Sequence, residues 1–402
     1  MFKEIKRGYI AAILALLILF AFTSELKDTL AADEDNNEIK DADIYFMSGD
    51  VPDYITEGAV SFMSGFSQES YEHLGYDKQQ ISGLYLAQPL TEYSYEDFPG
   101  RCTVFIYPVM NYENRIIGIL NAGIDAEGRN TYDFGKTFYC DLLNELTEES
   151  ETLSLISTRS SIWAINEKSE LTLLQDFFLG ELVIPEVTFK EVVMVNNKKI
   201  NLTENKIFIR SEDGKNSILA NSAPDSESGP DIYTTAASEQ NLNIPLIPNA
   251  APGKCWASSL ASMILFKITL PMSGTVFRDY LYSNAVAYTD PSGQVYDPGT
   301  SEYADYLLDY YLPSLDYNYS NSGWPSMSVI KSLISSSKPF YANWQCYGVG
   351  GHATVICGYN TDMHVLHSVY MMDPNYPNYR SLAYGSTFML NSSSYSLYGT
   401  VK

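Results

Sequence analysis

Two short motifs about a hundred residues apart carry the residue types of a nucleophilic enzyme. Residues 254–259 (KCWASS) place Cys255 at the start of an apolar run with helical spacing. Residues 350–353 (GGHA) place His352 between two glycines and a strand-like run. Asp373 ends the next strand-like segment. Cysteine, histidine and aspartate in this order predict nucleophilic catalysis by a thiolate.

Each of these groups has an expected chemical role. A cysteine at a helix N-terminus meets unpaired N–H groups and the positive end of the helix dipole, and both favour the thiolate. A nearby His352 imidazolium would stabilise that thiolate further, and Asp373 would orient the imidazole through its far nitrogen. The backbone N–H of Cys255 and one side-chain amide would then bind the oxyanion of a tetrahedral intermediate.

Other interpretations of the same residues stay open. Cys255 could be a buried structural thiol. Asp362, in a turn, is a rival to Asp373 for the third role. His364 and His367 stand three residues apart, but no third ligand is evident, so we predict neither a metal nor a cofactor.

The elements that must position these groups follow from hydrophobic periodicity. The spacing of apolar residues predicts a helix over 255–268, and further helices over 303–311 and 327–335. Strands are then expected over 340–344, 353–358, 365–372, 386–390 and at the C-terminal end. This α+β layout would put Cys255 on a helix and His352 on a sheet, facing each other across a cleft.

These motifs resemble the papain-like cysteine peptidases of bacteria. CWA followed by small residues, then GGHA with a strand, then a Met-rich strand ending in Asp-Pro-Asn, is similar to the bacteriocin-processing-peptidase-like group. Streptopain and staphopain are more distant kin. The resemblance covers residues 244–402 and implies that Cys255 is the nucleophile, His352 the acid and base, and Asp373 the orienting group.

The same resemblance leaves one departure from the family pattern. Papain-like enzymes place a Gln six residues before the cysteine as the oxyanion donor, and here that position holds Asn249. An Asn amide is one methylene shorter. Loss of this donor would cost roughly 3 kcal/mol of transition-state stabilisation, so a weak or silent enzyme remains an alternative.

The preceding region is predicted to be a second α+β unit, residues 32–210. Residues 104–109 and 115–120 read as strands joined by a turn, 138–146 and 169–178 as helices, and 192–195 with Ile200 as a hairpin. The unit is similar to the pro-domains of secreted papain-like peptidases, which implies an intramolecular inhibitor. Residues 211–243 are rich in Ser, Asn, Asp, Gly and Pro and are expected to be a flexible linker.

Charge and the N-terminus bear on partners and location. From Ile244 onward there are 7 Lys/Arg against 9 Asp/Glu, which leaves 18 against 40 before it. With no basic surface to neutralise phosphates, nucleic acid is an unexpected partner. Residues 1–31 have a basic start and an apolar stretch, which predicts export by a signal peptide, or membrane attachment if the segment stays uncleaved. Cys102 and Cys140 could pair in such a protein.

The sequence therefore predicts a secreted or cell-surface cysteine endopeptidase made as a zymogen. Its partners would be a peptide or protein substrate and its own pro-domain. Two alternatives stay open: a papain-like binding protein with little or no turnover, and a cell-wall amidase or acyl transferase that uses the same residues.

Overall fold

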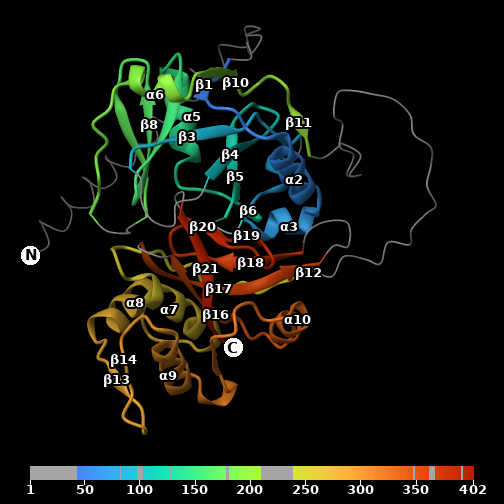
Figure 1. Cartoon of the computed structure of the whole chain (residues 1–402). Helices are drawn as coiled ribbons and strands as arrows, with labels where there is room; N and C mark the ends of the chain where they lie inside the picture. The colour runs from blue at the N-terminus through green and yellow to red at the C-terminus, as the bar shows by residue number, and fades with distance from the viewer. Residues whose placement is uncertain are drawn as a thin grey trace, which may run out of the picture. The chain divides into compact units, whose positions relative to one another are not determined.

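The computed structural model describes nine stretches of the chain: residues 43–81, 83–96, 103–125, 128–177, 181–209, 239–346, 349–361, 367–390 and 393–402. The predicted export segment and most of the predicted linker lie outside these residues. From Asp43 to Lys402 the chain clusters into one compact unit (Figure 1). It combines helices with a large sheet, so the predicted α+β class is confirmed.

An antiparallel sheet forms the β half of the C-terminal region. Its strands follow the order β15–β21–β16–β17–β18–β19, and β12 pairs with the far part of β17. Met372 lies opposite Val355, so the chain leaves β18 close to His352. The strands are β12 (Glu239–Asn241), β15 (Tyr319–Ser320), β16 (Phe340–Cys346), β17 (Gly350–Asn360), β18 (Ser368–Met372), β19 (Arg380–Ala383), β20 (Phe388–Leu390) and β21 (Ser393–Val401). Strand β12 falls inside the predicted linker. Its backbone pairs with β17, so these three residues belong to the sheet.

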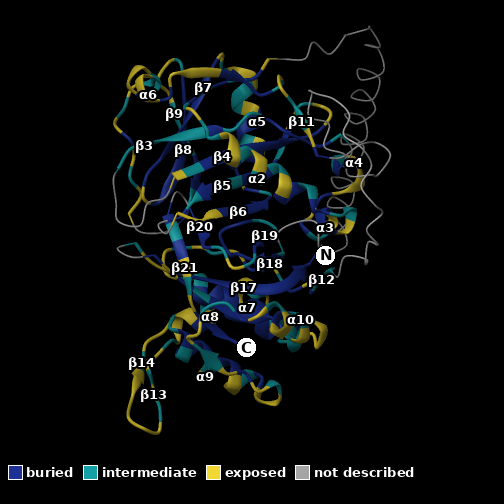
Figure 2. Ribbon diagram, turned by 45° about the vertical axis from the view of Figure 1, so that its right-hand side comes forward, coloured by how far each residue is buried: buried dark blue, intermediate teal, exposed yellow. Residues whose placement is uncertain are grey.

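Four helices pack on the side of this sheet away from the N-terminal region (Figure 1). Helix α7 lies against β17 and is buried at every position from 256 to 264. The elements are α7 (Cys255–Lys267), α8 (Gly274–Ser283), α9 (Ser301–Tyr311) and α10 (Met327–Ser335), with hairpin β13 (Tyr288–Thr289) and β14 (Val295–Tyr296) and the 3₁₀ turn η1 (Pro313–Leu315). Figure 2 shows the hairpin largely exposed and the central strands buried. The helices predicted at α7, α9 and α10 are confirmed.

The N-terminal region is built on two groups of strands. One is the antiparallel β4–β5–β6 meander with β2 and β3 beside β4, and the other contains β7–β8–β9 with β1 and β10. The strands are β1 (Tyr45–Ser48), β2 (Tyr85–Leu86), β3 (Leu90–Ser94), β4 (Thr103–Met110), β5 (Ile116–Ile124), β6 (Asn130–Gly135), β7 (Leu153–Ser157), β8 (Ser161–Asn166), β9 (Leu171–Asp176), β10 (Lys198–Asn201) and β11 (Ile207–Phe208). The helices are α2 (Asp53–Ser64), α3 (Gln68–His73), α4 (Lys78–Ile81), α5 (Cys140–Glu149) and α6 (Phe189–Val195).

The two regions share one sheet and one core. Strand β6 pairs antiparallel with β19, with Ser381 opposite Phe134. One hydrophobic cluster of buried residues runs from Ile44 to Val401 through both regions. A buried ion pair between Asp133 and Arg380 crosses the same junction. The N-terminal region is therefore continuous with the C-terminal region rather than tethered to it.

Two predictions in the N-terminal region are wrong. The segment predicted as a helix over 169–178 is strand β9, because Ser169 adopts a left-handed backbone (φ 65°) and turns the chain into a hairpin with β8. The strand predicted at 192–195 is helix α6. Thr188 and Glu191 form a reciprocal capping box at its start, and Val192 packs in a small buried cluster with Trp163. Capping and packing here outweigh the β-propensity of valine.

Among the described residues, none of the helices has both the length and the apolar character needed to span a bilayer.

Candidate active site

Cys255 is the first residue of helix α7 and is only partly buried. Gly253 has φ 76°, a left-handed conformation that suits glycine, and it turns the chain into the helix. The N–H groups of the first helical turn have no carbonyl of an earlier turn to bind. They face the N-terminal end of the helix together with the positive end of its dipole. Cys255 therefore lies at a helix N-terminus, as predicted.

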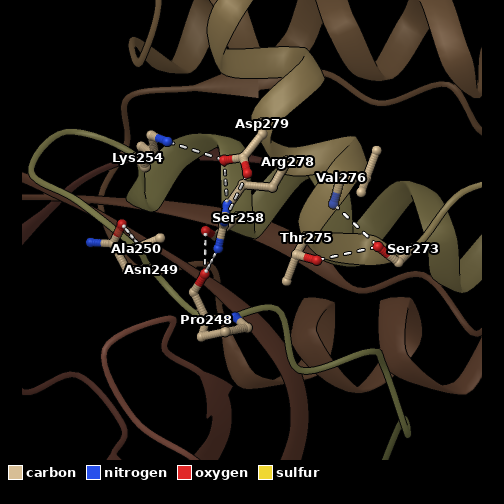
Figure 3. A network of polar contacts seen from close by, with 10 residues as sticks. All are labelled: Pro248, Asn249, Ala250, Lys254, Ser258, Ser273, Thr275, Val276, Arg278 and Asp279. Atoms are coloured by element: carbon tan, nitrogen blue, oxygen red, sulfur yellow. Dashed lines mark hydrogen bonds and ion pairs between the residues drawn. The ribbon is translucent and has the colours of Figure 1, made fainter.

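Residues 248–254, which lead into α7, are held by hydrogen bonds with side chains of helices α7 and α8 (Figure 3). The Pro248 carbonyl accepts hydrogen bonds from Ser258 Oγ (3.2 Å) and from the Arg278 guanidinium. Asp279 binds Arg278 and also accepts from Lys254 Nζ at 3.1 Å. The hydrogen bonds of Arg278 and then of Lys254 lower the pKa of Asp279 to about 2. Helix α8 thus fixes the residues on both sides of the turn before Cys255.

His352 lies near the start of β17, and a hydrogen bond joins this strand to helix α7. Ser259, one turn after Cys255, donates to the Ala353 carbonyl at 3.0 Å. Gly350 has φ 130°, which a residue with a Cβ rarely adopts. The glycine two residues before the histidine therefore has a conformational reason in the structure.

A buried hydrogen bond joins His352 to Asp373. His352 Nε2 lies 2.9 Å from Asp373 Oδ1, and the two side chains are 1% and 0% exposed. The same carboxylate oxygen accepts the backbone N–H of Asn375 at 2.9 Å. The Phe388 ring stacks on the imidazole with centroids 5.8 Å apart. Exclusion of water strengthens such a hydrogen bond.

The Cys255 thiol also acts on the His352 imidazole. Burial lowers the pKa of His352, but the Asp373 charge, the hydrogen bond to Asp373 and a hydrogen bond to Cys255 outweigh burial and raise that pKa to about 10. Because Nε2 is bound to Asp373, Nδ1 is the nitrogen left for the thiol. The structure thus brings Cys255, His352 and Asp373 together in the predicted order, with the pKa of His352 raised.

The other described thiols differ from Cys255 in exposure. Cys140, Cys346 and Cys357 are buried. Burial raises the pKa of all three, that of Cys346 to about 11. Cys102, the predicted partner of Cys140, lies outside the described residues. Within the described chain, Cys255 is the thiol that a reagent or substrate can reach.

Asn249, the predicted oxyanion donor, is held by its neighbours. Its Nδ2 donates to Asn375 Oδ1 at 3.1 Å, and its Oδ1 accepts the N–H of Ala250 at 3.0 Å. Its own N–H binds the Pro374 carbonyl at 2.7 Å. An amide nitrogen carries two hydrogens, so Asn249 has a second N–H besides the one that Asn375 Oδ1 accepts.

The rival residues stand outside this cluster or outside the described chain. Asp362 and His364 are not among the described residues, while His367 is. Across the described ranges, no group of three His, Cys, Asp or Glu side chains is arranged to hold a metal.

Asn375 and Arg278 belong to the site but did not stand out in the sequence. Asn375 follows Asp373 by two residues, and the turn-forming Asp-Pro-Asn string was the one available signal for it. Arg278 lies in a helix 23 positions after Cys255 and carries no local signal. The sequence was also compared with protein-family models and with curated proteins, and neither comparison gives a match.

Proposed function

We propose that this protein is a cysteine endopeptidase with Cys255 as nucleophile, His352 as general acid and base, and Asp373 as the group that orients His352. The observation that carries the proposal is the buried His352–Asp373 hydrogen bond. The same imidazole interacts with Cys255, a partly exposed cysteine at a helix N-terminus. That combination is what an activated thiolate requires.

The proposed reaction has two halves. The Cys255 thiolate attacks the peptide carbonyl carbon, and the oxyanion is held by the Cys255 N–H and the free N–H of Asn249. As the intermediate collapses, the C–N bond breaks and the His352 imidazolium gives its proton to the leaving amine, which leaves a thioester. Water then attacks the thioester while His352 takes the proton from the water, and the acid is released with the Cys255 thiolate restored.

The arrangement also supports our proposal of a papain-like architecture. The nucleophile begins a buried helix, the histidine lies on an antiparallel strand packed against that helix, and the acidic group follows the next strand. The idea that residues 32–210 are a removable inhibitor stays a prediction. The strand pairing between β6 and β19 supports a retained role for that region instead.

The proposal is tested by covalent labelling of the full chain. An epoxide inhibitor of the E-64 type should modify Cys255, as read by mass spectrometry of the tryptic peptide, and Cys255→Ala should give no such adduct. Casein should be degraded by the wild type and not by the variant. Absence of a Cys255 adduct both in the full chain and after cleavage within residues 211–243, in protein shown to be folded, would refute the enzyme. Cleavage of muropeptides without casein cleavage would instead favour an amidase.

A second candidate is a papain-like binding protein with little turnover. The observation that favours it is the commitment of the Asn249 amide to Asn375 and to Ala250. In that case Cys255 would still be alkylated, but no peptide or muropeptide would be cleaved. Labelling and digestion together therefore separate the two candidates.

A further inference from the structure

All four polar groups of the Asn375 residue are hydrogen-bonded, and two of the bonds come from the N-terminal region. Gln175 Nε2, on β9, donates to the Asn375 carbonyl at 2.9 Å, and Asn375 Nδ2 donates to the Phe177 carbonyl at 3.3 Å. Asn375 is 3% exposed and Gln175 5% exposed. Buried polar groups of this kind cannot exchange a lost partner for water at no cost.

The remaining two groups of Asn375 reach the catalytic residues. Its N–H donates to Asp373 Oδ1, the oxygen that also binds His352. Its Oδ1 accepts from the amide of Asn249, the proposed oxyanion donor. One buried side chain therefore connects the end of β9 to the orienting carboxylate and to the oxyanion donor at once.

Further contacts hold the end of β9 against the turn at residues 373–376. The Phe177 ring lies 6.3 Å from the ring of Tyr376, and the Arg380 guanidinium lies 4.0 Å from the centroid of the same tyrosine. Arg380 is fully buried and is paired with Asp133 of β6. Removal of the N-terminal region would leave that arginine unpaired and the edge of β19 without its partner strand, both of which are unfavourable.

We propose that the end of β9, through Gln175 and the Phe177 carbonyl, is a positioning element of the Cys255–His352–Asp373 site. The N-terminal region is then a permanent part of the working protein and not a segment released on activation. The inference rests on the proposed function, since it assigns a role toward that same triad. Gln175 acts through Asn375 and touches neither substrate nor the reacting atoms.

The test compares two buried hydrogen bonds that cross from the N-terminal region to the C-terminal one. Gln175→Leu removes the donor to Asn375. Thr131→Val is the matched control, because Thr131 Oγ1 donates to the Thr387 carbonyl at 2.7 Å from an equally buried position. The rate of Cys255 alkylation by iodoacetamide is measured from pH 5 to 10 by peptide mass spectrometry.

We expect Gln175→Leu to slow Cys255 alkylation on the order of tenfold, as misplacement of a catalytic group does. The acidic limb of its pH profile should also move to higher pH, because a displaced Asp373 stabilises the imidazolium, and through it the thiolate, less strongly. Thr131→Val should leave both the rate and the limb within about twofold of wild type. Equal profiles for the two variants would overturn the positioning role. If Gln175→Leu does not fold, Gln175→Met removes the same donor with an unbranched side chain of nearly the same length.

A second measurement separates retention from inhibition. A specific protease site is inserted near residue 225, and the full chain is cut there and passed over a sizing column. We expect both pieces to elute together, with Cys255 alkylation within about twofold of the uncut protein. Release of the N-terminal piece with faster alkylation would overturn the inference and support an inhibitor. Failure of the proposed function looks different: uncut wild-type Cys255 would react no faster than free cysteine.

Discussion

The Asp373 carboxylate raises the pKa of His352, and this should be measurable as pH-dependent stability. The perturbation is Asp373→Asn, made in a Cys255→Ala background so that no nucleophilic thiol titrates or cleaves. Asn can present its oxygen to His352 and to the Asn375 N–H in place of Oδ1. Asp373 Oδ2 has no partner among the described residues, so the amide nitrogen replaces it without breaking a hydrogen bond.

The sign follows from the raised pKa of His352. An unfolded histidine titrates near 6.5, and the folded one near 10 in the wild type, somewhat lower without the Cys255 hydrogen bond. Between these values the folded state keeps a proton that the unfolded state has lost. The stabilisation is therefore complete below pH 6.5 and disappears as the pH rises through the folded pKa. Each pH unit inside the window changes the free energy of unfolding by about 1.4 kcal/mol for one proton.

We expect the Cys255→Ala parent, with Asp373 intact, to lose about 2 kcal/mol more between pH 7 and pH 9 than the protein that also carries Asp373→Asn. Urea unfolding followed by tryptophan fluorescence at four pH values measures this difference. Tyr, Lys and the other thiols titrate alike in both proteins and cancel in the comparison. Parallel curves for the two proteins would show that Asp373 does not hold the proton, and the reasoning about the ion pair would fail.

Three further predictions follow from single contacts. Ser259→Ala should lower the free energy of unfolding by about 1–2 kcal/mol, since it removes a buried bond to a β17 carbonyl; Ser262→Ala, which loses only a bond within its own helix, should cost less in the same urea experiment. Asn249→Ala should reduce kcat on a peptide substrate on the order of a hundredfold in protein that is still folded, with a stability loss of about 1–3 kcal/mol because Asn375 Oδ1 loses its donor, and an unchanged kcat would remove Asn249 from the oxyanion site. Asp133→Ala should destabilise the protein by about 3–5 kcal/mol by leaving Arg380 buried and unpaired, and addition of Arg380→Met should recover part of that loss in thermal melts.

The catalytic candidates could be predicted because their signals are local. Cys255 at the start of an apolar helical run and His352 after a glycine pair are visible in windows of a few residues, and α7 begins at the predicted residue. Helix α10 matches its predicted bounds for the same reason, since Ser326 caps it and apolar residues recur at helical spacing. The errors at β9 and α6 lie in short apolar runs, where periodicity does not separate strand from helix.

The sequence by itself determined which residues could do the chemistry and on which kind of element each would lie. Only the tertiary structure decided that Asn375 joins Asp373, Asn249 and the end of β9, because those contacts span up to 200 residues of chain. It also decided that β6 extends the sheet of β19. Strand pairing and buried hydrogen bonds between distant segments depend on which surfaces meet after folding. The periodicity of a short stretch of sequence does not predict which surfaces these are.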